Sequence, residues 1–218
     1  MNTSIFRSGS ILLMLVCIPS FVVLGQMRSG KLGVGAGGSL YLFVENINDR
    51  LPKAGGGVNL SYSAMEHVGI RAMFGAGQLG WLDKVAAQRH TTNIFSANLY
   101  VSYDILPHST FNPFLFVGAG AIYFDPRDNA GVYPTASFEK FDINYLGGVG
   151  VDVFFSEFLS MTVSGEIAMA NTNKLDLGKT QRSRELYSRV NLEFRYYFFD
   201  EPYITKLIEA LQRRFDNK

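Results

Sequence analysis

Residues 189–198 read RVNLEFRYYF, and their side chains alternate in character. Apolar residues fill the even positions from Val190 to Phe198, whereas polar or charged residues fill the odd positions from Arg189 to Arg195. A period of two indicates a β-strand whose two faces meet different surroundings. The stretch therefore predicts a strand with one apolar and one polar face, which a soluble sheet or a membrane-spanning sheet can contain.

The same alternation recurs upstream. We expect strands near residues 31–44, 56–65, 68–78, 93–105, 112–125, 140–154, 157–169 and 185–199. Their connections alternate in length: those around 45–55, 79–92, 126–139 and 170–184 are long and polar, and those at 65–67, 106–110 and 156–157 are short. About eight strands with this loop pattern are typical of a bacterial transmembrane barrel. The sequence predicts an all-β fold, a closed antiparallel transmembrane β-barrel over residues 31–199.

The N-terminus resembles an export signal. Arg7 precedes an uncharged run from Ile11 to Leu24, and Val23-Leu24-Gly25 before Gln26 resembles a small-residue cleavage site. This layout predicts a signal peptide over residues 1–25, followed by a linker over 26–30. A retained membrane anchor and a lipoprotein acylated at Cys17 are the alternatives. An exported barrel belongs in the outer membrane, with its short turns in the periplasm.

Composition agrees with a barrel and excludes other classes. Lys+Arg 20 against Asp+Glu 19 gives a net charge of +1, so no overall field attracts nucleic acid, and none is expected as a partner. Aromatic residues make up 14% of the chain, which also has 22 glycines. Aromatic rings gather at membrane interfaces, and glycine relieves crowding between closely packed strands.

Two motifs resemble those of a known family. Phe111-Asn112-Pro113-Phe114 runs into Gly118-Ala119-Gly120, and the last strand closes on Phe198-Phe199. In these features residues 31–199 resemble the small outer-membrane barrels that include the OmpA transmembrane domain, OmpX, OmpW and PorT-type proteins. The resemblance implies an architecture, not an activity, and it implies insertion by the barrel-assembly machinery. The chain departs from the family by continuing to residue 218.

In the tail over residues 200–218, the spacing of apolar residues changes from a period of two to that of a helix. Pro202 suits the start of a helix, and the apolar residues that follow have helical spacing. We expect a periplasmic amphipathic helix over 200–218 that caps the barrel mouth or lies on the inner leaflet. The alternative is a docking helix for a periplasmic protein, through Ile204, Leu207, Ile208, Leu211 and Phe215.

The polar strand faces are expected to point inward. An eight-stranded barrel is barely wide enough for its own side chains, and buried charges must pair. Equal spacing from the connecting loops pairs Glu166 with Arg189, and Arg71 with Asp104. Such a network plugs the lumen, or gates a narrow path for ions. Its expected members are Arg71, Asp104, Asp152, Glu166, Arg189, Glu193 and Arg195.

Enzymatic interpretations are weak, and no catalytic, cofactor-binding or metal-binding residue is expected. Residues 75–80, GAGQLG, match a dinucleotide fingerprint without the strand–turn–helix that it requires. His108-Ser109 resembles a motif of lipid A deacylases, but its spacing differs and it falls on a predicted periplasmic turn. A palmitoyltransferase-like rim would use His90, Ser96, Asp142 and Asn144.

Aromatic residues near the predicted strand ends fit interfacial girdles. They are Tyr41, Phe43, Trp81, Phe95, Tyr103, Phe124, Phe141, Phe155 and Tyr196. The main competitor is a soluble lipocalin-like barrel, which would use aromatic residues as its core and would need polar outward faces.

The expected function is structural or interactive, with specificity carried by the outer loops. The expected partners are outer-membrane lipid and lipopolysaccharide, whose phosphates basic loop residues would contact. The alternatives are a narrow pore for ions or small hydrophobic molecules, an accessory subunit of a secretion or assembly machine, and an outer-leaflet lipid-modifying enzyme.

Overall fold

The computed structural model describes residues 30–44, 50–83, 88–127, 140–172, 174–175 and 184–199. The expected signal peptide and the tail helix lie outside these residues. None of the described residues belongs to a helix able to cross a membrane. The strands in the described part are β1 (Leu32–Phe43), β2 (Arg50–Leu51), β3 (Lys53–Ser63), β4 (Val68–Asp83), β5 (Gln88–Asp104), β6 (Phe111–Arg127), β7 (Phe141–Phe154), β8 (Leu159–Ala170) and β9 (Glu185–Phe199).

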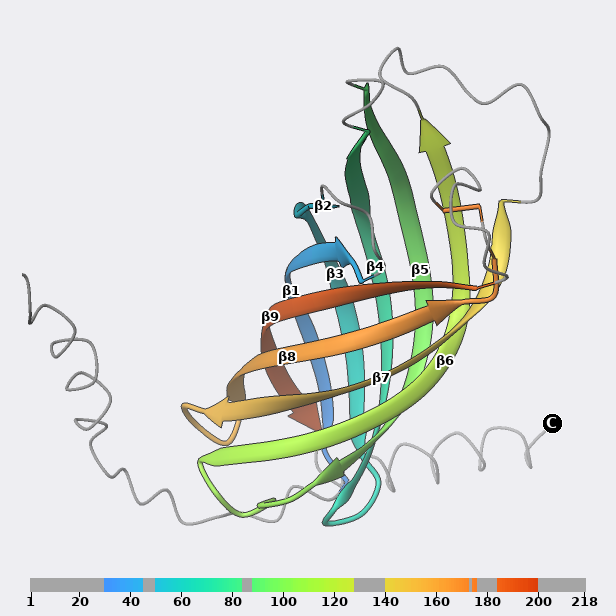
Figure 1. Cartoon of the computed structure of the whole chain (residues 1–218). Coiled ribbons are helices and arrows are strands. Elements are labelled where there is room, and N and C mark those ends of the chain that lie inside the picture. Colours follow the sequence, from blue (N-terminus) through green and yellow to red (C-terminus); the bar gives the residue numbers. More distant parts are fainter. Residues whose placement is uncertain are drawn as a thin grey trace, which may run out of the picture.

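The long strands close into a ring. Each pairs antiparallel with its neighbours in the order β1-β3-β4-β5-β6-β7-β8-β9, and β9 pairs back to β1. Figure 1 shows the resulting tilted barrel. The short β2 pairs only with the end of β4, and Pro52, which has no N–H to donate, separates it from β3. In the described residues the fold is thus an eight-stranded antiparallel barrel, as predicted.

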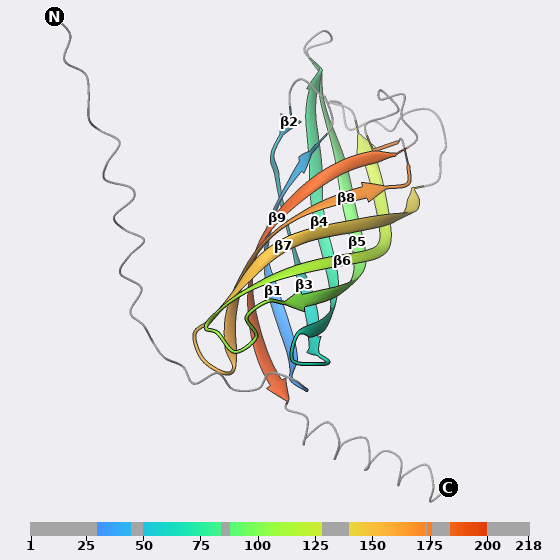
Figure 2. The same ribbon diagram turned by 60° about the horizontal axis from the view of Figure 1, so that its bottom comes forward.

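The two ends of the barrel differ. Short turns over residues 64–67, 105–110 and 155–158 form one end, here called the turn end. The opposite end, where strands β1, β4, β6 and β8 finish, is here called the loop end (Figure 2). The expected long loop over residues 79–92 is wrong. Strands β4 and β5 stay paired as far as Asp83 and Gln88, because Leu79, Trp81 and Thr92 continue the inward alternation.

The outward face of the barrel is apolar at mid-height. On β5, Phe95, Leu99 and Val101 are each more than half exposed, while Asn98 and Ser102 on the same strand are buried. The run from Phe95 to Tyr103 is about the nine residues that a tilted membrane strand needs. A soluble barrel would need the reverse arrangement, so the lipocalin-like alternative is wrong.

The apolar belt has defined borders on several strands. At the loop end, Gln78, Asn93 and Asp125 are register partners on three neighbouring strands, and Gln78 Nε2 donates to Asn93 Oδ1 at 2.9 Å. Phe95 and Tyr123 form an aromatic pair beside this polar row, with ring centroids 6.2 Å apart. At the turn end, exposed aromatic residues mark the other border: Tyr103, Phe111, Phe155, Phe158, Tyr196 and Phe198.

Four aromatic residues that were predicted to lie in the interfacial girdles point into the barrel. Tyr41, Phe43, Trp81 and Phe124 are almost fully buried inside the barrel rather than exposed to lipid. The glycines of β1 do not reveal which of its residues point inward. On β4 and β6, every second residue continues to point inward as far as the loop end. The aromatic residues at these positions therefore fill the lumen.

Glycines on the inward face make room for these rings. A Cβ added to Gly77 would lie 2.2 Å from Cε2 of Tyr41, and one added to Gly150 would lie 2.4 Å from Cζ of Phe114. Contacts this short do not occur between real atoms, so both positions exclude any side chain. The high glycine content thus serves a lumen packed with large side chains.

Candidate functional site: the barrel lumen

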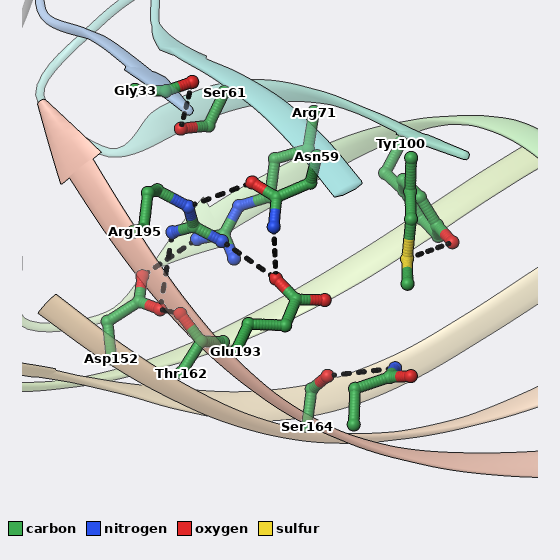
Figure 3. A network of polar contacts seen from close by, with 12 residues as sticks. Gly33, Asn59, Ser61, Arg71, Tyr100, Asp152, Thr162, Ser164, Glu193 and Arg195 are labelled. Atoms are coloured by element: carbon green, nitrogen blue, oxygen red, sulfur yellow. Dashed lines mark hydrogen bonds and ion pairs between the residues drawn. The ribbon is translucent and has the colours of Figure 1, made fainter. Parts of the chain in front are cut away.

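One cluster of charges crosses the lumen in the half nearer the turn end. Arg195, on β9, is 1% exposed, and its Nη1 lies 3.5 Å from Oδ1 of Asp152 on β7. Its Nη2 lies 3.5 Å from Oε2 of Glu193, and its Nε donates to Oδ1 of Asn59 on β3 at 3.2 Å. Arg71 of β4 completes the cluster through Nη2, 2.8 Å from Oδ2 of Asp152 (Figure 3).

A second cluster lies nearer the loop end. Glu166 on β8 and Arg189 on β9 are register partners, and Arg189 Nη2 lies 2.7 Å from Oε1 of Glu166. The same guanidinium donates to the hydroxyls of Tyr100 at 2.7 Å and Tyr41 at 3.2 Å. These contacts join β1, β5, β8 and β9 across the barrel. Because both charges are almost fully buried, each depends on its partner.

The structure places all seven sequence-predicted network residues inside the barrel. Arg71 lies between two carboxylates, 2.8 Å from Asp152 and 3.9 Å from Asp104. Three of the seven residues are arginines and four are carboxylates, so this network is close to charge balance. The two pairs proposed from loop spacing, Glu166 with Arg189 and Arg71 with Asp104, lie within ion-pair distance.

Neutral side chains complete the network, and sequence reasoning missed them. Asn59 bridges Arg195 and Glu193, and Thr162 donates to Asp152. Tyr41 and Tyr100 bind Arg189. The one available signal was alternation: Asn59 and Thr162 occupy the polar phase of their strands. The tyrosines gave no such signal, because an aromatic residue suits either face of a barrel.

The inward face of β6 contributes an aromatic wall to this half of the lumen. The guanidinium carbon of Arg71 lies 4.0 Å from the ring centroid of Phe114, and Phe114 packs against Phe116. A cavity of about 30 Å³ remains between this wall and the charged side chains, and one of about 10 Å³ lies nearer the turn end. Arg71 and Arg195 line both cavities. Spaces of this size hold about one or two water molecules each.

Toward the loop end the lumen holds a group of buried apolar side chains beside polar ones such as Thr92, Asn144 and Glu185, and the sequence did not indicate this group. Trp81 and His90 are register partners stacked with centroids 4.1 Å apart, beside a cluster of buried apolar side chains. Among the members of this cluster are Phe43, Leu79, Ile94, Ile122, Phe124 and Leu175. The expectation of a polar interior thus holds for only part of the barrel length.

The sequence motifs considered for catalysis lie within a strand and a short turn. Residues 75–80 are in the middle of strand β4 and do not form the turn that a dinucleotide fingerprint needs. His108 lies in the turn after β5, where its Nε2 is 2.7 Å from Oε1 of Glu66. Within the described ranges, no three His, Cys, Asp or Glu side chains are grouped to hold a metal.

Comparison with known proteins identifies relatives of the fold. A scan of family models gave no match, and neither did a search of curated proteins. Among solved structures, Neisserial surface protein A aligns with a TM-score of 0.59 at 10% identity, over 77% of this chain and 97% of that one. The outer membrane protein OprG from Pseudomonas aeruginosa aligns with a TM-score of 0.53 at 12% identity, over 80% and 99%.

The fold and the surface together define the class of this protein. A closed ring satisfies its backbone hydrogen bonds internally, and its outward apolar belt is bordered by aromatic residues. Charged side chains are gathered in the lumen, away from lipid. The chain is a small transmembrane β-barrel of the kind that bacterial outer membranes contain.

Proposed function

We propose that this protein is an outer-membrane scaffold whose barrel does not conduct ions and whose loop end carries its interactions. The observation that supports this proposal is the buried network of Arg71, Asp152, Arg195, Glu166 and Arg189, which crosses the lumen from several strands. The cavities beside it hold about one or two water molecules each. A hydrated ion needs a continuous path, and the small size of these cavities supports a lumen without one.

Planar-bilayer conductance tests the proposal. Refolded wild-type protein should give no discrete current steps, whereas D152A/R195A, which shortens two side chains in the network, should give small steps or increased noise. The matched control is V163A/L192A, a register pair on the outward face of β8 and β9. This control should behave as the wild type, because it changes only the lipid contact.

The competing function is a narrow pore. It predicts discrete, reproducible steps from the wild-type protein, and that result would refute the proposed closed lumen. Heat-modifiable gel mobility should be measured for every variant, so that currents are recorded only from folded barrels. If D152A/R195A does not fold, R195Q preserves most of the side-chain volume while removing the charge, and silent wild-type bilayers still separate the two functions.

A further inference from the structure

The lipid-facing side of the barrel has a hollow that extends over β6, β7, β8 and β9. Its volume is about 430 Å³. Among its described lining residues Ser164 alone is polar, and the hydroxyl of Ser164 accepts a hydrogen bond inside the barrel from Nδ2 of Asn191 at 3.3 Å. The hollow therefore offers hydrocarbon contacts. Its outward walls are formed by Leu115, Val149, Val151, Val163 and Val190.

Gly165 lies in this hollow between Val149 and Val190, its register partners on β7 and β9. A Cβ added to Gly165 would meet no atom within 4 Å, whereas one added to Gly77 would clash. Both pairings of β8 continue past Gly165 without a register shift, and among the described residues only Gly30 is a glycine with positive φ. A glycine inside a strand weakens it, and one that neither crowding nor a bulge requires often marks the close approach of another molecule.

The hollow runs from the turn end toward mid-height. Ile105, in the turn after β5, and Pro113, the third residue of β6, line it near the turn end. Gly165 is the seventh residue of β8 counted from the turn end, and Val190 is the tenth residue of β9 counted from the same end. The hollow therefore begins near the aromatic border at the turn end and continues into the apolar belt, over the depth range of one leaflet.

We propose that this hollow is a binding site for one hydrocarbon chain of a phospholipid from the leaflet at the turn end. The hollow is continuous with the lipid-facing belt, and a chain of methylene groups needs no hydrogen-bond partner. Lipid tails are as apolar as the barrel surface, so preference for this position comes from van der Waals contacts. Valine side chains are stiff at χ1, which keeps the walls in place. A chain lying over Gly165 contacts both walls and the backbone between them.

Photocrosslinking locates the chain. Refolded wild-type protein is inserted into phosphatidylcholine vesicles with a trace of the same lipid carrying a mid-chain diazirine, and labelled residues are mapped by peptide mass spectrometry. Val149 and Leu99 are matched positions, because each is an exposed residue and the sixth from the turn end of its strand. We expect about threefold more labelling around Val149 than around Leu99, a modest ratio because each van der Waals contact contributes little.

Filling the hollow should remove this excess. G165L places a side chain in the open space without a clash, so labelling around Val149 should fall to the level around Leu99. The control is A76L, which adds a leucine at an exposed position of β4, on the opposite side of the ring from β8 and outside the hollow. A76L should keep the wild-type labelling pattern. Gel mobility without boiling checks that both variants are folded.

Two results would overturn the proposal: equal labelling around Val149 and Leu99 in the wild type, or unchanged labelling around Val149 in G165L. A second barrel seated on the hollow would exclude lipid, so weaker labelling around Val149 than around Leu99 would also refute it. If G165L does not fold, the wild-type comparison of the two positions decides. The closed lumen is tested separately, because conductance depends on the inward side chains.

Discussion

Arg195 shows why the lumen tolerates so many charges. Its guanidinium meets Asp152, Glu193, Asn59 and the hydroxyl of Tyr197, so every buried charge in its cluster has at least one partner. Breaking a buried pair from one side leaves an uncompensated charge, whereas replacing both partners removes the problem. The network should therefore respond very differently to single and paired substitutions.

R195L removes the arginine that pairs with Asp152 and Glu193. The substitution should lower the free energy of unfolding by about 3–5 kcal/mol, because Asp152 keeps only Arg71 as an ionic partner. The double variant D152N/R195L should recover part of that loss. Urea titration of vesicle-inserted protein, followed by gel mobility without boiling, measures both. Equal loss in the single and double variants would contradict the proposed dependence between the two charges.

At the scale of the element, β5 shows how one strand serves two environments. Its outward residues change from polar Asn93 to apolar Phe95 and Leu99, whereas its inward residues are mainly polar, with Ile94 and Tyr100 among them. The outward face therefore changes character along the strand, while the inward face stays mixed. Lipid determines the outer pattern, and packing against the opposite wall determines the inner one.

This pattern predicts a depth dependence for a charge on the lipid side of β5. L99R, in the middle of the apolar belt, should destabilise the inserted barrel by about 2–4 kcal/mol, whereas N93R, at the polar border, should cost about 0–1 kcal/mol. The measurement is the urea midpoint of each variant in vesicles. Similar midpoints for the two variants would mean that β5 does not cross the bilayer at this height.

At the scale of the whole molecule, the two ends of the barrel differ in charge. Exposed arginines among the described loop-end residues include Arg50, Arg89 and Arg184, whereas the turn end carries Glu66, Glu157 and Lys31. Lipopolysaccharide presents phosphates at the outer surface of an outer membrane. We propose that the loop end faces these phosphates, which arginine binds well through its planar donor array.

Lipopolysaccharide binding tests this orientation. R50Q/R89Q/R184Q should weaken binding of the folded barrel to lipopolysaccharide micelles, and the remaining affinity should depend less on salt, because exposed charges act mainly through screened attraction. K31Q, at the turn end, is the control and should bind as the wild type. Immobilised protein and two salt concentrations suffice. Unchanged binding by the triple variant would remove the proposed role of these arginines.

Local pattern predicted the barrel and much of its lumen. Alternation on β9 assigns Arg189, Glu193 and Arg195 to one face, and repetition of such strands requires a closed ring. Closure in lipid then places that face inside. The reason is physical: a strand's two faces alternate with a period of two, so each residue carries its orientation in its own position.

Other features depended on which residues meet across the barrel, and local sequence does not contain that information. The inward orientation of Tyr41 on the glycine-rich β1 depends on Gly77 of β4, which leaves room for the ring. The apolar cluster at the loop end depends on Leu79, Ile94 and Phe124, which lie on different strands at similar depth. It also includes Leu175, which lies 83 residues beyond Thr92, the residue that donates to its carbonyl oxygen. Sequence alone determined the faces of the strands; the tertiary structure decided what each face meets, because closure brings distant strands to the same depth.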